Sequence, residues 1–290
     1  QKERAVVSVK AEVESHLNAA VPVTITAVVA KLNDDTQSES GPLAESDSFT
    51  ATIAGNNSHN FRLDIPVSNP VLWDIDHPEL YRVVVTLSQG NALTDRYEVS
   101  FGFRTIEFTP RDGFLLNGRR VEIKGVCNHH ALGALGTAFN IRAAERQLEI
   151  LKEMGCNAIR TSHNPPAPEL LDLCDRMGFL VEDEAFDAWK TPKKRNDYSK
   201  LFYAWHEEDL RAMIRRDRNH PCVVLWSTGN EVGDQNNPAL SESLRTIVKS
   251  EDNTRPVTAG CDRDESGTNG FQLTLDVFGI NYRLHRYDAF

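Results

Sequence analysis

Apolar and polar residues alternate along several short segments of residues 1–104. A period of two places one face of a strand against a core and the other face in water. Polar turns such as 33–35 and 55–58 separate these segments, and no long helical pattern intervenes. The predicted strands are residues 21–29, 48–53, 61–65 and 80–87. Short strands at this spacing predict an antiparallel β-sandwich of immunoglobulin type, which we interpret as a domain that braces its neighbour.

From residue 105 to 290, strands alternate with helices. Ala144 and Leu148 fall on one face of a predicted helix, and Gly155 follows as its end. The predicted strands are 121–126, 157–161, 179–183, 223–227, 257–259 and 277–280, and the predicted helices are 143–154, 168–177, 205–219 and 239–250. This order predicts a parallel sheet with helices outside it. We expect an incomplete (β/α)8 TIM barrel rather than an open doubly wound sheet, because no Gly-rich phosphate motif follows the first strand.

The number of predicted strands falls short of a closed barrel. Six strands are predicted and a closed barrel of this type has eight. We therefore expect that the last two strands were cut off or come from another chain, unless the sheet is open. A partial barrel leaves an open sheet edge and an exposed apolar face, which favour association into a homo-oligomer.

Charge and composition exclude several classes of partner. The chain has 290 residues, 40% hydrophobic and 26% charged, with a net charge of −10. Nucleic acids and anionic membranes need a basic face, so neither is an expected partner. No apolar run approaches the length of a membrane span. A neutral ligand such as a sugar is compatible with this balance.

The cysteines and the start of the chain carry little information about compartment. The cysteines are odd in number and widely scattered, so we expect buried thiols rather than a disulfide framework or a zinc site: Cys127, Cys156, Cys174, Cys222 and Cys261. Residue 1 is Gln rather than an initiator Met, and the first residues lack the apolar core of a signal peptide. We expect a soluble protein, cytoplasmic or exported, whose natural start lies elsewhere.

Polar residues gather where the predicted parallel strands end. In such a barrel the chemistry sits at the carboxyl ends of the strands. The residues at these ends are Asn128, His129, His130, Ser162, His163, Asn164, Asp183, Glu184, Asp187, Trp189, Asn230, Glu231, Asn281, Tyr282 and Arg283. Polar tips on five strands of one rim predict a functional site.

Two kinds of chemistry fit this rim poorly. His129, His163, Asp183 and Glu231 could collect around a cation, but the tight His spacing of a catalytic zinc helix is missing. We therefore assign no metal and no cofactor, although a divalent cation is compatible. Nucleophilic Ser-His-Asp chemistry is disfavoured because no Gly-x-Ser-x-Gly element follows a strand.

Glycosidic cleavage fits better. It needs a protonated acid that donates to the leaving oxygen and a carboxylate that attacks or stabilises the sugar carbon. Glu231 can be the acid if burial and a nearby negative group raise its pKa. Asn230 can hold a sugar hydroxyl beside the bond being broken, and Trp189 can stack on an apolar sugar face.

Several runs, in order, resemble glycoside hydrolase family 2, and most closely its β-galactosidase branch. They are LWDIDHPELY, FGFRTIEFTPRDGFLLNGRRVEIKGVCNHH, AIRTSHNP, EDEAFDAW, RDRNHPCVVLWSTGNE and DVFGINY. The resemblance spans essentially the whole chain. It implies a jelly-roll domain, an immunoglobulin-like sandwich and a (β/α)8 barrel, of which this sequence begins at the sandwich.

The resemblance also implies roles for single residues. Glu231 matches the general acid/base, and Asn230 matches the residue that binds the sugar beside it. His129 and His163 match histidines that hold substrate hydroxyls, although both could also be loop or core residues. Asp183 and Glu184 receive no role from the resemblance. They could hydrogen-bond the backbone at a strand end rather than take part in the functional site.

Two further residues match the family around its nucleophile. Arg160 and Tyr282 match residues that orient and assist a Glu at the end of the seventh strand, and no position here matches that Glu. Arg160 could instead be a structural ion-pair partner. The family's magnesium pattern, a Glu and a His after the third strand, is not reproduced, and Asp187 stands there instead as an expected substrate-binding residue.

The sequence therefore predicts part of a retaining exo-β-glycosidase that acts on β-galactosides through a double displacement. By this hypothesis Glu231 is the acid/base, the nucleophile is absent from the chain, and the chain alone is inactive. A β-glucuronidase or β-mannosidase of the same family is an alternative. Another alternative is a non-catalytic fragment that binds carbohydrate or serves assembly.

Overall fold

A computed structural model describes residues 4–32 and 41–289 of the chain. The chain divides into two compact units, residues 1–104 and 105–290, and each has its own core. The turn predicted at 55–58 begins with a turn at Gly55 and Asn56, whereas the one predicted at 33–35 lies outside the described residues. In the described part of the chain, no helix combines the length and apolar character that crossing a bilayer requires.

The first unit is an immunoglobulin-like sandwich of antiparallel strands. One sheet pairs β1 (Arg4–Ser15) with β5 (Asn57–Ser68). The other has the order β3 (Ala44–Glu45), β2 (Val21–Lys31), β6 (Tyr81–Gln89) and β7 (Ala92–Phe101), with β4 (Phe49–Ile53) also paired to β2. The sequence pattern predicted β2, β4, β5 and β6, and it missed β1, β3 and β7.

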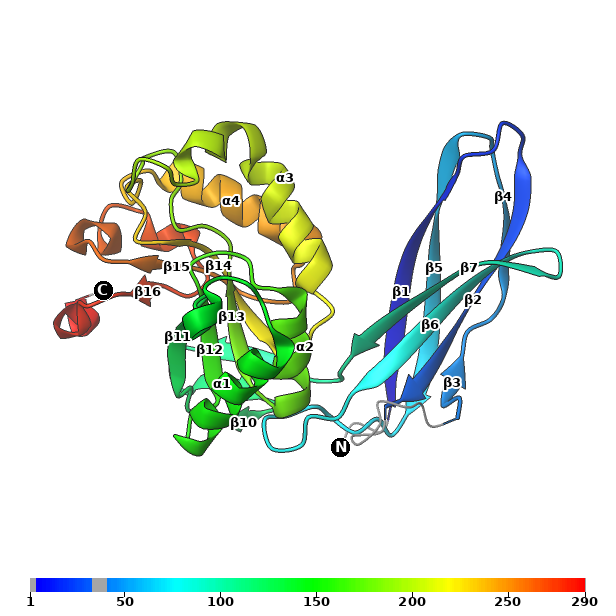
Figure 1. The fold of residues 1–290 in the computed structure, drawn as a ribbon, viewed down its shortest axis with the longest axis horizontal. Helices are drawn as coiled ribbons and strands as arrows, with labels where there is room; N and C mark the ends of the chain where they lie inside the picture. The colour runs from blue at the N-terminus through cyan, green and yellow to red at the C-terminus, as the bar shows by residue number, and fades with distance from the viewer. Residues whose placement is uncertain (1–3, 33–40, 290) are drawn as a thin grey trace. The chain divides into compact units, whose positions relative to one another are not determined.

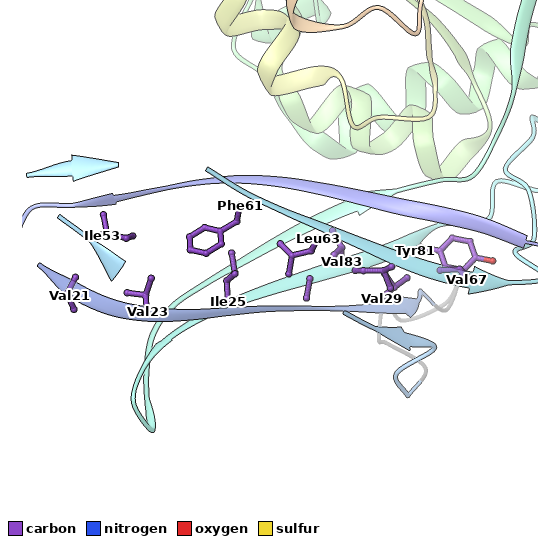
Figure 2. Packing of buried hydrophobic residues seen from close by; sticks show 12 residues of the cluster. Val21, Val23, Ile25, Val29, Ile53, Phe61, Leu63, Val67, Tyr81 and Val83 are labelled. Atoms are coloured by element: carbon purple, nitrogen blue, oxygen red, sulfur yellow. The ribbon is translucent and has the colours of Figure 1, made fainter. Parts of the chain in front are cut away.

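Alternation along these strands builds the core between the two sheets. Every second residue is buried from Val21 to Val29 in β2 and from Phe61 to Val67 in β5. Ile25, Leu63 and Ile65 are at most 1% exposed. Figure 2 shows Ile25 and Leu63 pointing into the space between the strands. Burial of apolar surface from both sheets holds the sandwich together.

The second unit begins with a small antiparallel sheet and continues as a parallel one (Figure 1). The small sheet, which the sequence pattern did not predict, contains β8 (Ile106–Thr109), β9 (Gly113–Leu116) and β10 (Arg119–Arg120). The parallel sheet has its strands in chain order: β11 (Gly125–His129), β12 (Ala158–Ser162), β13 (Leu180–Glu184), β14 (Val223–Asn230), β15 (Val257–Cys261) and β16 (Gly279–Ile280). This arrangement is an incomplete (β/α)8 barrel, as predicted.

Helices connect most strands of the parallel sheet. They are α1 (Ile141–Glu153), α2 (Pro168–Met177), α3 (Ser199–Asp217) and α4 (Pro238–Glu251). Asn140 and Asn237 cap α1 and α4 by accepting a backbone N–H, and Gly178 ends α2 at a φ of 69°. Each strand can therefore run in the same direction, so that all six present their carboxyl ends at one edge.

Two predicted boundaries in the second unit differ from the structure by four residues or more. Helix α3 begins at Ser199 instead of residue 205, because Asp197 accepts hydrogen bonds from the Ser199 backbone N–H and hydroxyl. Strand β11 begins at Gly125 instead of residue 121. Residues 121–124 precede it without strand structure, although Lys124 is tied to Asn157 by a backbone-to-side-chain hydrogen bond.

Candidate functional site

Three neighbouring strands bring Arg160, Glu184 and Asn230 together. Strands β12, β13 and β14 are adjacent and parallel, so their carboxyl ends lie side by side. Arg160 Nε and Nη2 donate to Glu184 Oε2 at 3.0 and 2.6 Å, and Nη2 also donates to Asn230 Oδ1 at 2.9 Å. The Arg160 side chain is 13% exposed and that of Glu184 is fully buried. The guanidinium thus links two polar side chains out of contact with bulk water.

Glu184 is the centre of this network. Its carboxylate also accepts a hydrogen bond from Ser227 Oγ at 2.6 Å, and His163 Nδ1 lies 2.6 Å from its second oxygen. Burial lowers the pKa of Arg160, but the carboxylates of Glu184 and Glu182 outweigh this and raise it above its ordinary value. Arg160 therefore keeps its charge at every working pH. Burial raises the pKa of Glu182 to about 7, although the positive charge of Arg160 opposes this rise.

Glu231 follows β14 in a left-handed turn with a φ of 43°. Its backbone N–H donates to the Gly260 carbonyl at 2.7 Å, and its Oε1 accepts a hydrogen bond from Asn281 Nδ2 at 2.9 Å. The side chain is neither fully buried nor fully exposed. A non-glycine residue with positive φ is uncommon and costs free energy, and such residues concentrate at functional sites.

Strands β15 and β16 complete the surroundings of Glu231. Gly260 leaves room for its neighbours, since an added Cβ would lie 2.7 Å from Arg160 Nη2 and 3.1 Å from Asn281 Nδ2. Tyr282 also has a positive φ, 61°, and a hydrogen bond to Glu231 raises the pKa of its phenol. The Tyr282 side chain is largely exposed, so it reaches Glu231 from the solvent side.

The loop between β13 and α3 adds Asp187 and Lys193. Lys193 Nζ donates to Asp187 Oδ1 at 2.8 Å and to the Asn230 carbonyl at 2.6 Å. Asn230 Nδ2 donates to the same Asp187 oxygen at 3.0 Å. Burial raises the pKa of Asp187, but the hydrogen bonds from Lys193 and Asn230 outweigh it and the pKa is lowered. Asp187 is therefore an anion next to Asn230.

A cavity of about 910 Å³ opens beside Asp187, and Asn230 and Glu231 are not among the residues that line it. His129, His163 and Asp187 line it together with Phe186 and Tyr198, whose stacked rings have centroids 4.8 Å apart. The rings of His129 and His163 are 5.1 Å apart. A cavity of this volume, lined by imidazoles, carboxylates and aromatic rings, suits a sugar, which has polar edges and apolar faces.

Most of the predicted site residues lie in one connected region. Arg160, Asn230 and Glu231 are joined through hydrogen bonds that include Asn281, and Tyr282 joins Glu231. The other members of the region are His129, His163 and Asp187. The roles of these residues stay predictions.

Trp189 needs a correction. Its side chain is fully buried, its Nε1 donates to the Thr228 carbonyl at 2.8 Å, and its ring stacks on Phe271. A ring with no exposed face cannot stack on a sugar, so Trp189 is a core residue. Asp183 is also fully buried, and burial together with the nearby Asp217 raises its pKa.

Sequence reasoning left Glu184, Lys193 and Asn281 without a catalytic or binding role. Glu184 and Asn281 were in the predicted polar tips, and strand alternation could have placed Glu184 and Arg160 on the same face of the sheet. Lys193 lies in an irregular loop without periodicity, so no pattern pointed to it. Among the described residues, the one group of three side chains that could hold a metal is Asp175, His220 and Cys222, near the opposite end of β14.

Two family models match the chain. One describes the TIM barrel domain of glycosyl hydrolases family 2 and matches residues 108–286, and the other describes glycosyl hydrolases family 2 and matches residues 1–104. Over 257 residues the chain is 48% identical to beta-galactosidase BoGH2A of Bacteroides ovatus. Over 197 residues it is 36% identical to a beta-galactosidase of Thermoanaerobacter pseudethanolicus. These alignments cover 77% and 66% of this chain but 30% and 25% of the relatives.

Solved structures give the same likeness. A glycosyl hydrolase family 2 member from Bacteroides cellulosilyticus matches 99% of this chain with a TM-score of 0.92 and 37% identity. A beta-glucuronidase of Bacteroides uniformis matches 97% with a TM-score of 0.81 and 27% identity. The chain covers 36% and 34% of these two proteins, so it spans about a third of their length.

Proposed function

Because the chain belongs to glycoside hydrolase family 2, we propose that it supplies the acid/base half of a retaining exo-β-galactosidase site. The observation that carries the proposal is the position of Glu231. It directly follows the strand that ends at Asn230, and it is hydrogen-bonded to Asn281 within reach of the Arg160 network.

In the proposed reaction Glu231 donates its proton to the glycosidic oxygen as the bond to the leaving group breaks. A second carboxylate attacks the sugar carbon from the other side, and Glu231 then removes a proton from the water that releases the sugar. The two carboxyl groups of a retaining enzyme lie about 5–5.5 Å apart. Glu184 does not suit the second role, because it is fully buried and ion-paired with Arg160. We expect the nucleophile from a strand that would follow β16.

The charges around the cavity support a neutral sugar over a uronic acid. Three carboxylates line it, Asp187, Asp197 and Asp209, against one guanidinium, Arg216. A sugar carboxylate would be repelled by this balance, whereas hydroxyl groups can donate to carboxylates and imidazoles. The beta-galactosidases among the relatives support the same substrate class.

The test is Glu231→Gln in the full-length gene product. We expect kcat/KM for a β-galactoside with a poor leaving group to fall by about 10³-fold or more, while an activated aryl β-galactoside loses far less, because it needs little protonation. Glu208→Gln, an exposed position on α3, is the matched control. Equal turnover of the β-galactoside with the poor leaving group by variant and parent would refute the acid role of Glu231. Turnover of a β-glucuronide or β-mannoside, but of no β-galactoside, would refute galactose as the sugar.

A further inference from the structure

Lys193 lies between two residues of the candidate site. Its ammonium is 2.8 Å from Asp187 Oδ1 and 2.6 Å from the Asn230 carbonyl, and its side chain is 23% exposed. A lysine on a surface loop ordinarily points into water, where its ion pairs contribute little. This lysine instead points toward the sheet and contacts the residue that precedes Glu231.

The loop fixes the position of Lys193 through its backbone. Asp197 Oδ2 accepts hydrogen bonds from the backbone N–H groups of Lys193 and Lys194 at 2.6 and 2.7 Å. Two residues earlier, Thr191 donates through its backbone N–H and its hydroxyl to Asp234, at 3.0 and 2.8 Å. These hydrogen bonds hold the loop in place, and the loop in turn positions the Lys193 ammonium.

The consequence falls on Asp187. Its Oδ1 accepts two hydrogen bonds, from Lys193 and from Asn230 Nδ2, whereas its Oδ2 accepts none from the described residues. The side chain is 47% exposed and lines the cavity together with His163. A carboxylate with one oxygen occupied by two donors has its plane fixed, and the second oxygen remains as an acceptor.

We propose that Lys193 is a positioning residue and that Asp187 determines specificity, accepting a hydrogen bond from one hydroxyl of the non-reducing sugar. This inference rests on the proposed function and names the contact that selects its substrate. Asp187 Oδ2 can accept a hydrogen bond from the sugar hydroxyl next to it, and it would repel a sugar carboxylate at the same place. Because Lys193 also contacts the Asn230 carbonyl, it couples this contact to the end of β14, directly before Glu231.

The test compares substrates that lack single hydroxyl groups, in the full-length gene product. For 4-nitrophenyl β-galactoside and its 3-, 4- and 6-deoxy analogues, kcat/KM is measured for the parent protein, Lys193→Met, Lys193→Arg and Asp187→Asn. The parent should lose about 10- to 100-fold on one analogue, because that analogue leaves a charged acceptor unpaired. In Lys193→Met and Asp187→Asn this loss should shrink below about 3-fold, and Lys193→Arg should restore part of it.

Lys194→Met is the matched control, since the Lys194 side chain makes no hydrogen bond or ion pair among the described residues. It should leave every ratio unchanged. If Lys193→Met slows the parent sugar and all analogues by one common factor, or slows none, the inference is wrong while the proposed function stands. If the unmodified protein cleaves a β-glucuronide and no β-galactoside, the proposed function fails and this inference with it.

Discussion

The two units treat their charged residues differently. In the first unit Arg62 and Asp64 form an ion pair on the surface of β5, with side chains 63% and 50% exposed. In the second unit Arg160 and Glu184 form the same kind of pair with 13% and 0% exposure. The chemistry of the two pairs is alike, and the difference is the amount of water around them.

The degree of burial separates the Arg62–Asp64 pair from the Arg160–Glu184 pair. An exposed ion pair contributes about 0–1 kcal/mol to stability, because water screens it. A buried pair must overcome a large desolvation cost and persists only where further hydrogen bonds satisfy both groups. Ser227, His163 and Asn230 supply those contacts around Arg160 and Glu184. The second unit thus carries buried charge at the place where the strand ends meet.

The largest effect is expected from Arg160→Met. It leaves the buried Glu184 carboxylate without its counter-charge, so we expect a loss of about 3–5 kcal/mol of stability. In the full-length gene product kcat/KM should also fall by about 10³-fold, since Asn230 loses its hydrogen bond from Arg160. Denaturant unfolding and turnover of an aryl β-galactoside measure the two effects. Unchanged stability would show that the pair is better solvated than its geometry indicates.

A comparable loss of stability without loss of chemistry is expected from Leu63→Ala. Leu63 is fully buried between the two sheets of the first unit, and its truncation should cost about 2–5 kcal/mol. The kcat of the folded fraction should stay within about 2-fold of the parent. A large fall in kcat below the unfolding transition would contradict the separation of the two units' tasks.

A smaller, pH-dependent effect is expected from Glu182→Gln. The pKa of Glu182 rises from its ordinary 4.5 to about 7 on folding, chiefly through burial. Between these values the folded chain keeps a proton that the unfolded chain has lost, so stability falls as pH rises from 4.5 through 7. The variant should therefore be more stable than the parent above pH 7, by about 1–2 kcal/mol given that the side chain is 28% exposed, and the difference should vanish near pH 4.5. Urea unfolding across pH 4–8 measures it.

The smallest effect is expected from Arg62→Met in the first unit. The pair with Asp64 is exposed, so its removal should change the free energy of unfolding by less than about 0.5 kcal/mol. An Arg→Met substitution is then expected to lower stability strongly in the second unit and hardly at all in the first. A loss of more than about 2 kcal/mol here would remove the contrast between solvated and buried pairs.

The sequence predicted the parts of the fold that depend on local pattern. Period-two alternation identified β2 and β5, and Gly178 identified the end of α2. The sequence did not predict β8–β10, whose strands of two to four residues are too short for a period to show. The early start of α3 depends on the side chain of Asp197, which lies before the helix.

The candidate site was predicted where strand ends carry polar residues and missed where loops supply them. Glu231 and Asn230 follow from parallel strand order, because neighbouring carboxyl ends must meet. Arg160 lies in the middle of β12, and only the family resemblance pointed to it. Lys193 could not be found this way, since its ammonium reaches Asn230 only through an irregular anchored loop. Trp189 was misassigned because position along the chain does not reveal on which side of a loop an aromatic ring is buried.

Gly260 brings no side chain to the site, and yet the site depends on it. A single methyl group at this position would push on Arg160 and Asn281 at once. Strand β15 therefore contributes by lacking a side chain here, which leaves space for Arg160 of β12 and for Asn281, which follows β16. A description of the candidate site that counts only acids, bases and amides would therefore overlook Gly260, although their close approach depends on it.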